Sequence, residues 1–573
     1  MATVQSGSTQ SPSLENLAAN GTGYDIGQLR GVFENHFTWT TAFERNVHRY
    51  ARRAAISDPE TGRSWTYAEL GVVTGQLVEG LRRAGVGVGD MVSYQLMNRP
   101  EFAFLYVAAQ GVRAVSSPMN FRLSPGETAF ILDETKPVVF VYEREQASVV
   151  AQALELATHT PAVVAGVGDG PLLDGTVAFE ELLATDAPSF RAPQDGSVWD
   201  ESSRLFTSGT TGMPKAVPLT SLNETLSAHD VIMAFPLAST DKTMNMSPWF
   251  HRGGNYCAGP NPALFVGAEV VCLRRFDEAV VLDAIEGSKL TYVIGAPTNL
   301  ERLADEQETN PRDISSLRGI VTMGAPLEKA AAIRYQKTLH PRLMNGYGTT
   351  EAFWNTFLRP EDLPEFAGSA GRACIDDDVA VVHVYEDRFA EPGDTVPKDG
   401  HTVGEVIMRT IKAGYAYSDA ERTAEKFRDG WMYPGDLATW DENEIVTIVG
   451  RKDDMLISGG ENVHPVQVEE ALAEHPGVAD SIVTGLADEE WGELVVAYVR
   501  RKPGALADEQ QAANDLDAHC KAHPGLADFK RPRRYAFVDD LPYTATGKKQ
   551  HYILKNQALE DASGGRFVSP SRR

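Results

Sequence analysis

The sequence predicts an α/β fold with a large N-terminal domain of layered mixed sheets flanked by helices, and a small, mobile α+β C-terminal domain. Three observations predict it. Short apolar runs of strand length alternate with helix-length segments over most of the chain, a pattern typical of parallel, layered sheets. Apolar runs at 403–409 and 444–449 indicate a more antiparallel section. The stretch Gly450–Asp454 is charged and lacks bulky side chains, and a compact unit follows it.

These changes predict the domain boundaries. Residues 1–35 are rich in Ser, Gly, Asn and Thr and are expected to form a flexible lead-in. The N-terminal domain is expected over 36–450, the C-terminal domain over 451–560 and a tail over 561–573.

The first elements of the N-terminal domain alternate between helix and strand. Residues 67–84 have apolar side chains at helical spacing, although Gly71, Gly75 and Gly80 weaken this helix. A second helix, opened by a proline, is expected over 100–115. Strands are expected at 91–96, 137–142 and, more weakly, 163–167.

The alternation continues to the end of the compact unit. In the N-terminal domain we expect strands at 216–219, 269–273, 292–294 and 320–323, and helices from Ser221 and over 277–287. In the C-terminal domain we expect a helix from Pro465, strands at 481–484, 494–499 and 535–538, and a polar helix over 507–521.

Composition limits the functional classes. The 573 residues are 42% hydrophobic and 23% charged, the balance of a globular protein with ample core. The formal net charge of −26 argues against a nucleic-acid or anionic-membrane partner, because both select a basic surface.

Targeting signals are not evident in the sequence. No apolar run reaches the roughly 18 residues of a membrane span, and the N-terminus lacks the basic and apolar regions of a signal peptide. The four cysteines show neither metal-ligand spacing nor a disulfide pattern. We therefore expect a cytoplasmic protein.

The segment Thr207–Lys215, TSGTTGMPK, predicts a phosphate-binding loop. Glycine lets the backbone direct its N–H groups inward, hydroxyl side chains add donors, and a lysine adds a charge suited to phosphate. The residues concerned are Thr207, Ser208, Gly209, Thr210, Thr211, Gly212 and Lys215. The spacing is not that of a Walker loop, and the strand-like residues after Lys215 predict that the loop joins two strands. An ordinary Gly/Thr hairpin is the alternative.

A second motif, NGYGTTE at Asn345–Glu351, fits a tight turn beside a flat ligand. Tyr347 is suited to stack on a base, and Glu351 is a hard oxygen ligand suited to Mg²⁺ beside phosphates. The alternative is a helix cap, with Thr-Thr-Glu opening the first turn.

Four further positions carry weaker signals. Asp436 follows a glycine turn and is suited to ribose hydroxyls, and Arg451 is suited to ribose or phosphate. Lys548 lies on a loop near the end of the chain, and His251 is a lone histidine in PWFHRGG. Each residue also has an ordinary alternative. Asp436 fits a plain turn aspartate and Arg451 a solvated charge run, while Lys548 fits a solvated lysine and His251 a structural histidine.

The order of the motifs is more informative than any one of them. TSGTTGMPK, GAPL, YGTTE, GDLA, GRKDDMLISGGENVHP and TATGKK follow one another along the chain. In this order and spacing, from about Phe37 to Leu554, the chain resembles the adenylate-forming (ANL) superfamily. That superfamily includes acyl- and aryl-CoA synthetases, adenylation domains of peptide synthetases and firefly luciferase. The segments NGYGTTEA and SGGENVHP look most like 4-chlorobenzoate–CoA ligase-like enzymes.

The resemblance implies an AMP-forming carboxylate–CoA ligase. In the family reaction a carboxylate attacks the α-phosphorus of ATP, giving an acyl-adenylate and pyrophosphate, and the CoA thiol then displaces AMP. ATP, CoA and Mg²⁺ are the implied cofactors. The resemblance assigns the phosphates to Thr207–Lys215, the α-phosphate to Thr350, Mg²⁺ to Glu351, the ribose to Asp436 and Arg451, and the adenine to Gly324, Ala325, Pro326, Asn345, Gly346 and Tyr347.

The resemblance also implies movement of the C-terminal domain between the two half-reactions, about a hinge at Asp453. Lys548 would bridge the carboxylate and the α-phosphate in the first half-reaction. Gly459, Gly460 and Trp491 would line the CoA tunnel in the second. The implied acyl pocket contains Phe250, His251, Arg252, Met323, Gly348, Phe353 and Trp354, with His251 gating or shaping it.

Several positions depart from the family pattern. The family usually has an apolar residue after the lysine at 548 and an arginine two positions further on, and here these places are occupied by Lys549, Gln550 and His551. Lys549 therefore competes with Lys548 for the role of catalytic amine. Pro434 replaces a common threonine. Arg252 is unusual and either pairs with a second acidic group on the substrate or lies on the surface.

Bulky Phe250, Phe353 and Trp354 favour a small aromatic or a short- to medium-chain acid. Two other functions stay open: a stand-alone adenylation enzyme that loads an acyl carrier protein, and a nucleotide-binding homologue without catalysis. Luciferase-type oxidation is remote. The resemblance also allows a homodimer.

Overall fold

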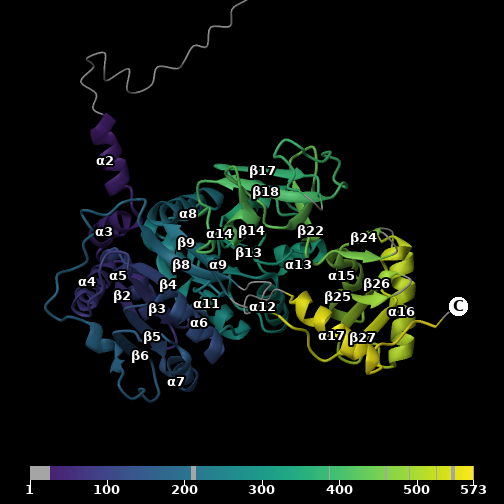
Figure 1. Ribbon diagram of the computed structural model, residues 1–573, viewed down its shortest axis with the longest axis horizontal. Helices are drawn as coiled ribbons and strands as arrows, with labels where there is room; N and C mark the ends of the chain where they lie inside the picture. The colour runs from purple at the N-terminus through teal and green to yellow at the C-terminus, as the bar shows by residue number, and fades with distance from the viewer. Residues whose placement is uncertain are drawn as a thin grey trace, which may run out of the picture.

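The structure is a computed structural model that describes residues 26–207, 214–385, 388–458, 461–488, 491–523, 526–543 and 549–571. Within these residues the chain forms four sheets of seven, nine, six and five strands, with helices packed against them. The predicted α/β class is confirmed (Figure 1). The described helices include none that is long and apolar enough to cross a membrane.

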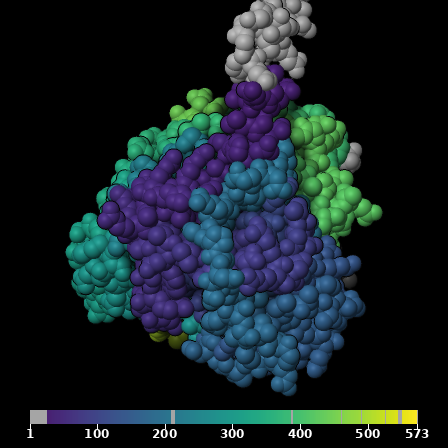
Figure 2. Space-filling view, turned by 90° about the vertical axis from the view of Figure 1, so that its left-hand side faces the viewer, coloured from purple at the N-terminus to yellow at the C-terminus, as the bar shows by residue number. Residues whose placement is uncertain are grey.

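The described chain begins with helix α2 (Ile26–His36), which buries none of its residues and projects from the body of the molecule (Figures 1 and 2). Helix α3 (Trp39–Arg49) follows, and the Thr38 hydroxyl caps it by accepting from the Thr41 N–H. Trp39 and Phe43 of α3 are fully buried. Extensive burial therefore begins at α3.

The seven-stranded sheet is parallel except at one edge, where β8 and β9 form an antiparallel hairpin. The strand order is β7-β6-β5-β3-β4-β8-β9. The strands are β3 (Met91–Gln95), β4 (Val115–Pro118), β5 (Val139–Glu143), β6 (Val163–Val167), β7 (Val177–Ala178), β8 (Glu201–Thr207) and β9 (Lys215–Thr220). The hairpin confirms that the Gly/Thr-rich loop joins two strands.

The nine-stranded sheet has a parallel centre and antiparallel edges, in the order β16-β15-β14-β13-β12-β10-β11-β1-β2. Its strands are β1 (Ala54–Asp58), β2 (Arg63–Thr66), β10 (Lys242–Asn245), β11 (Glu269–Val271), β12 (Tyr292–Gly295), β13 (Gly319–Met323), β14 (Leu343–Thr349), β15 (Phe353–Leu358) and β16 (Arg372–Ala373). Because β10, β12, β13 and β14 are parallel, the segments that follow them meet at one edge of the sheet.

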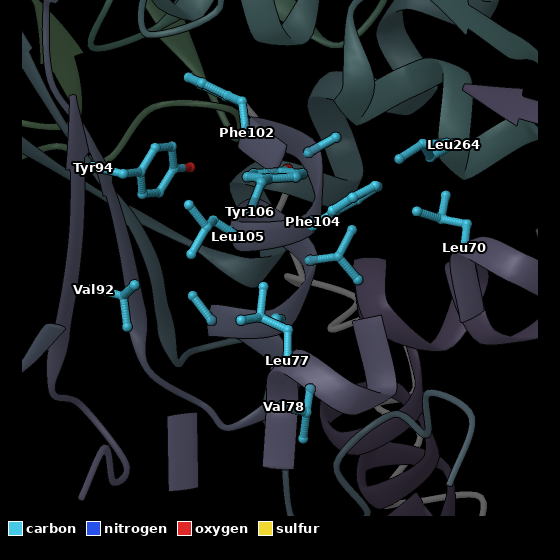
Figure 3. Close-up of a cluster of buried hydrophobic side chains, with 14 of the residues drawn as sticks. Leu70, Leu77, Val78, Val92, Tyr94, Phe102, Phe104, Leu105, Tyr106 and Leu264 are labelled. Carbon is cyan, nitrogen blue, oxygen red and sulfur yellow. The ribbon is translucent and has the colours of Figure 1, made fainter. Parts of the chain in front are cut away.

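Helices connect and cover these two sheets. They are α4 (Tyr67–Arg83), α5 (Pro100–Gly111), α6 (Pro125–Thr135), α7 (Ala147–Leu156), α8 (Ser221–Ala234), α9 (Arg252–Tyr256), α10 (Pro260–Val266), α11 (Glu278–Ser288), α12 (Pro297–Thr309) and α13 (Lys329–Thr338). Every residue of α5 is buried, because α5 lies between the seven-stranded sheet and α4 (Figure 3).

The six-stranded sheet is antiparallel, as the sequence predicts for this section. Its strands are β17 (Asp377–Val382), β18 (Gly404–Thr410), β19 (Phe427–Arg428), β20 (Trp431–Met432), β21 (Asp436–Trp440) and β22 (Val446–Arg451). Helix α14 (Ala420–Lys426) precedes β19. This sheet brings the beginning of β21 and the end of β22 together, since Asp436 is the register partner of Arg451.

The C-terminal region forms the five-stranded sheet and its own hydrophobic cluster. Its elements are β23 (Leu456–Ser458), β24 (Glu461–Val463), α15 (Pro465–Ala473), β25 (Val478–Asp488), β26 (Gly492–Arg501), α16 (Glu509–Ala522), β27 (Arg534–Val538) and α17 (His551–Ser563). In Figure 1 this region lies to one side of the sheets, beside α12 and α13. Helix α17 runs past residue 560, and Val568 bridges Tyr535, so residues that the sequence places in a tail pack on this sheet.

Helix α4 contains three glycines that the sequence identifies as weak points, and the structure shows why they are there. They face the segment 182–190. A Cβ on Gly80 would lie 1.6 Å from the Leu182 carbonyl oxygen, and one on Gly75 would lie 2.1 Å from the Pro188 carbonyl oxygen. The glycines let this segment approach the helix, and Leu182 and Phe190 of the segment join the same hydrophobic cluster as Leu70 and Leu77 (Figure 3).

We predict that Gly80→Ala destabilises the protein by roughly 1–3 kcal/mol, because the new methyl group overpacks the contact with Leu182. This cost exceeds the gain of up to about 1 kcal/mol in helix propensity. The measurement is the midpoint of urea denaturation. Gly287→Ala in α11 is the control, because a Cβ there meets nothing within 4 Å, and it should be neutral or stabilising. A Gly80→Ala variant as stable as the Gly287→Ala variant would contradict the close approach.

Candidate active site

Two motifs lie side by side where β13 and β14 end. Met323 of β13 is the register partner of Gly346 of β14, so Gly324–Pro326 leaves the sheet beside Asn345–Tyr347. Gly324 has a φ of +85°, a conformation that glycine adopts without strain. Asn345 is buried, and its side-chain amide donates to the Ser369 carbonyl at 3.2 Å. The carboxyl edge of a parallel sheet is a usual ligand-binding position in α/β proteins.

Tyr347, Asp436 and Arg451 form one hydrogen-bonded cluster. The Tyr347 hydroxyl donates to Asp436 Oδ2 at 2.6 Å, and the Arg451 guanidinium donates to Asp436 Oδ1 at 2.7 Å. Burial raises the pKa of Tyr347, and the Asp436 carboxylate raises it further, so the phenol stays neutral. The structure thus joins three residues that the sequence places far apart. Asp436 is therefore not an isolated turn residue. The Arg451 side chain is 43% exposed, but it bonds to Asp436.

The residues after Arg451 begin the link to the C-terminal region. Asp453 is 56% exposed at its side chain, and its carboxylate lies 3.7 Å from the Arg451 guanidinium. Pro434, which departs from the family pattern, contributes its carbonyl oxygen as an acceptor for Lys426 Nζ at 3.1 Å.

Glu351 and Lys215 meet at a tyrosine that the sequence analysis missed. Tyr417 donates its hydroxyl hydrogen to Glu351 Oε1, and Lys215 Nζ lies 5.9 Å from the centroid of the Tyr417 ring. Glu351 is 8% exposed. The run Gly-Tyr-Ala-Tyr at 414–417 was the available signal, but nothing in it marks Tyr417 as a partner of Glu351.

The hairpin that carries Lys215 is only partly described. Thr207 and Lys215 are register partners at its open end. The other predicted phosphate-binding residues, Ser208, Gly209, Thr210, Thr211 and Gly212, lie outside the described residues. The same holds for Lys548, Gly459 and Gly460.

The helix-cap alternative for Asn345–Glu351 is wrong. Strand β14 continues to Thr349, a turn follows in which the Thr349 hydroxyl accepts from the Ala352 N–H at 3.1 Å, and β15 begins at Phe353. Thr350 and Glu351 therefore lie at the tip of an antiparallel hairpin. No helix follows because β14 and β15 exchange backbone hydrogen bonds instead.

Three residues of the predicted acyl pocket, Phe250, His251 and Met323, lie close together in the structure. The rings of Phe250 and His251 are 4.1 Å apart, and Phe121 packs edge-on against Phe250 at 5.8 Å. His251 precedes α9, and a Cβ on Gly253 in this helix would lie 3.1 Å from Met323 Sδ. Phe250, His251 and Met323 are thus joined through α9.

Other predicted pocket residues belong to the packed interior. Gly348 of β14 is the register partner of Trp354 in β15, and a Cβ on Gly348 would be 1.7 Å from the Phe353 carbonyl oxygen. Trp354 is a core residue: its indole N–H donates to Asp230, and its ring covers Gly346. Arg252 is 2% exposed, so the expectation of a surface arginine is wrong. Its guanidinium donates to Thr350 and Lys412 carbonyl oxygens.

A cleft of about 1440 Å³ separates the N-terminal sheets from the C-terminal region. Phe121 and Met246–Pro248 line one side, close in sequence to Phe250, and Asp480 and Tyr543 line the other. Several basic residues that the sequence analysis did not select also line it: Arg122, Arg274, Arg275, Arg302, Arg334, Arg500 and Lys502. Tyr543 directly precedes the segment that contains Lys548.

Lys549, the competing amine, is held in a carboxylate cluster. Its Nζ lies 2.9 Å from Asp480 Oδ1 and 3.1 Å from Glu469 Oε2. His551 Nε2 lies 2.7 Å from the other oxygen of Glu469. Trp491 packs beside Leu486 and Leu494 under the Arg533 guanidinium, 5.4 Å from its ring centroid, and is not part of the cleft lining.

The chain as a whole is similar to known proteins. Residues 43–415 match the family model of AMP-binding enzymes, and residues 467–548 match that of the AMP-binding enzyme C-terminal domain. A feruloyl-CoA synthase from Amycolatopsis is 34% identical over 520 residues, which cover 88% of this chain and 96% of the relative. An indoleacetate–CoA ligase from Aromatoleum aromaticum is 32% identical over 506 residues, covering 87% and 93%.

A solved structure agrees with these relatives. A crystal structure of an anthranilate CoA ligase in complex with anthranoyl-AMP superposes with a TM-score of 0.83 at 26% identity, covering 92% of this chain and 98% of that one. The family model, the relatives and the shared fold extend over both the N-terminal sheets and the C-terminal region. This chain therefore belongs to the AMP-binding enzymes, the adenylate-forming family that includes acyl- and aryl-CoA ligases.

Proposed function

We propose that this chain, an AMP-forming acid–CoA ligase, activates a small aromatic or short- to medium-chain carboxylic acid with Mg·ATP and transfers the acyl group to CoA. The acid and ATP give an acyl-adenylate and pyrophosphate, and the CoA thiol then attacks the acyl carbon and releases AMP. The observation that carries the proposal is the meeting of the Tyr347–Asp436–Arg451 cluster with the Lys215–Tyr417–Glu351 group around the tip of the β14–β15 hairpin.

The nucleotide would lie along the carboxyl edge of the nine-stranded sheet. Asp436 and Arg451 would hold the ribose, with Gly324–Pro326 and Asn345–Tyr347 around the adenine. Thr350 would contact the α-phosphate, and Lys215 with the loop before it would hold the β- and γ-phosphates. Tight backbone and charged contacts of this kind position two anions that otherwise repel each other.

Glu351 fits a Mg²⁺ ligand. Mg²⁺ is usually held by one or two carboxylates together with substrate phosphates and water. The structure offers such a single buried carboxylate, and the described residues contain no cluster of three or more His, Cys, Asp or Glu that forms a complete metal cage. The Tyr417 hydroxyl orients the carboxylate through Oε1. When bound, Mg²⁺ would neutralise phosphate charge.

The region around His251 and three of the similar proteins support the proposed substrate class. Phe250 and Phe121 narrow this region, and the interior behind it is filled by Phe353 and Trp354. The feruloyl-CoA synthase, the indoleacetate–CoA ligase and the anthranilate CoA ligase are named for aromatic acids. A compact, partly aromatic site favours an acid of that size.

Lys548 is the proposed catalytic amine. Lys549 is a poor candidate because two carboxylates already hold it. Burial alone lowers the pKa of Lys549, but Glu469 and Asp480 raise it well above its ordinary value. Lys548 would contact the acid and the α-phosphate in the first half-reaction. Movement about Asp453 would then withdraw it and bring Gly459, Gly460 and Trp491 toward the CoA tunnel. We place the reaction in the cytoplasm, and a homodimer is compatible with it.

The first experiment is pyrophosphate release with Mg·ATP across a panel of benzoates, cinnamates, short and long fatty acids and diacids, with and without CoA. A small aromatic or short acid should give the highest kcat/KM, and its thioester should form only with CoA. Turnover of long fatty acids alone would contradict the substrate class. Adenylation without use of CoA would favour a carrier protein as acceptor, and silence across the panel would favour a homologue without catalysis.

We predict that Lys548→Ala lowers the rate of pyrophosphate release by at least about 100-fold, because a charge aimed at the reacting groups is lost. Thiolation of a supplied acyl-adenylate should change only a few-fold. Lys549→Ala is the matched control, one position along the same segment, and should retain most of the adenylation rate. Equal loss in the two variants, or equal loss of both half-reactions in Lys548→Ala, would contradict the assigned role.

His551 gives a pH-dependent contribution to stability. Burial by itself lowers its pKa and Lys549 opposes protonation, but Glu469 and, at 4.0 Å, Asp454 raise the pKa above the ordinary value of 6.5. The pKa of Glu469 is lowered to about 2 by Lys549 and His551, against the effect of its burial, so Glu469 stays ionised. Because the pKa of His551 is higher in the folded than in the unfolded state, protonated His551 stabilises the fold. This contribution is complete below pH 6.5 and is lost as the pH rises through the folded-state pKa.

We therefore predict that His551→Gln lowers the free energy of unfolding most near about pH 6 and least near about pH 9. Urea denaturation across this range measures the difference from the parent protein, which should change by at most about 1.4 kcal/mol per pH unit. His401→Gln is the control, because His401 is exposed, and it should give a flat difference. A flat difference for His551→Gln as well would show that its charge does not contribute.

A further inference from the structure

Arg252 is a buried cation without a buried counter-ion in contact. Its side chain is among the largest that are fully buried, and no described carboxylate lies within 4.0 Å of its guanidinium. Its Nε has no hydrogen-bond partner among the residues that the structure describes. Burial lowers the pKa of Arg252 to about 10, so the side chain stays charged at neutral pH. The carboxylates of Glu224, Glu351 and Asp377 favour this charge from beyond contact distance. A buried charge that contacts no opposite charge is still costly, so this arrangement calls for an explanation.

The guanidinium joins three separate segments. Nη1 donates to the Thr350 carbonyl oxygen at 2.7 Å, and Nη2 donates to the Lys412 carbonyl oxygen at 2.8 Å and to the Ser227 hydroxyl at 3.1 Å. The rings of Tyr256 and Phe353 lie 5.4 Å and 5.5 Å from it. One side chain thus ties α8, the β14–β15 turn and the segment after β18 to α9.

The contact with Thr350 constrains the peptide that connects Thr350 to Glu351. The carbonyl of Thr350 and the N–H of Glu351 point in opposite directions in a trans peptide. Because Arg252 holds the carbonyl toward the interior, the Glu351 N–H points away from the guanidinium. The orientation of Thr350 and Glu351 therefore depends on Arg252, although Arg252 contacts the side chain of neither.

The contact between Arg252 and the Lys412 carbonyl oxygen holds the segment 412–417, which packs against Glu351. Lys412 Nζ lies 2.7 Å from Asp230 Oδ2 and 2.9 Å from Asp377 Oδ2, and it donates to the Trp354 carbonyl oxygen at 2.8 Å. The same segment reaches Glu351 twice, by the Gly414 N–H at 3.2 Å to its carbonyl oxygen and by the Tyr417 hydroxyl to its carboxylate. Arg252 connects both segments that hold Glu351.

We propose that Arg252 is a positioning residue for the phosphates of Mg·ATP, and not a residue that reads the acid. It orients the Thr350–Glu351 peptide against the segment 412–417, and its positive charge, which contacts no described carboxylate, favours an anion on the far side of that peptide. This inference rests on the proposed function, since it needs the ATP phosphates at Thr350 and Glu351. It replaces the expectation that Arg252 pairs with a second carboxylate of the substrate.

The test compares Arg252→Lys with the parent protein by calorimetry of Mg·ATP and of adenosine. Lysine keeps the charge but cannot donate to all three acceptors in the planar geometry of a guanidinium. The affinity for Mg·ATP should fall at least tenfold and that for adenosine less than twofold. In kinetics, the KM for ATP and the Mg²⁺ concentration at half-maximal rate should rise, while the KM for the acid stays unchanged.

Two further variants make the result decisive. Arg359→Lys is the matched control, because Arg359 also donates to a carbonyl of α8, that of Ala234, but lies away from Glu351; it should bind Mg·ATP normally. Ser227→Ala removes one acceptor of Arg252 with little effect on folding and should weaken Mg·ATP binding about threefold. If Arg252→Lys is poorly folded by its melting curve, Ser227→Ala carries the test.

The outcomes separate the inference from the proposed function. Equal losses for Mg·ATP and adenosine, or unchanged Mg·ATP affinity in both variants, would overturn the positioning role. A selective rise in the KM for the acid would instead assign Arg252 to the acyl pocket and overturn it too. A parent protein that fails to bind Mg·ATP at all would overturn the proposed function itself.

Discussion

The parallel pairing of β13 with β14 is the constraint on which the rest of the site depends. It places Met323 opposite Gly346, so the two chain segments that leave the sheet there, Gly324–Pro326 and the residues after Tyr347, start from one edge. From that edge β14 turns back into β15, and the turn presents Thr350 and Glu351. A one-residue shift of β14 in this register would turn the side chains of β14 to the opposite face of the sheet.

Charged groups around this turn are arranged in two ways. Tyr347, Asp436 and Arg451 form an ordinary neutralised cluster, and Lys412 is neutralised by Asp230 and Asp377. Arg252 is different, since backbone carbonyl oxygens and a hydroxyl solvate it in place of a carboxylate. Carboxylates of Glu224, Glu351 and Asp377 act on this charge only from beyond contact distance. We infer that the charge also attracts an anion on the other side of the Thr350–Glu351 peptide, where low-dielectric surroundings strengthen the attraction.

The C-terminal region adds a second set of charges across the cleft. Glu469 and Asp480 neutralise Lys549, and Glu469 also pairs with His551. These contacts tie down the residues just after Lys548, while the Tyr543 hydroxyl donates to Asp480 just before it. The two departures from the family pattern at 549 and 551 thus share one carboxylate partner, which links the start of α17 to α15 and β25.

The α/β class and most strands and helices of both regions could be predicted from the sequence alone, and the order of the motifs at 207–215, 345–351 and 436 indicated the family. Local periodicity and glycine placement carry that information because they act within one element. The sequence did not determine the partners of Arg252, the role of Tyr417, the core position of Trp354 or the helix α17. Those depend on contacts between distant segments. Only tertiary packing decided which side of β14 and β15 each side chain faces, because alternation along a strand specifies two faces without saying which one is buried.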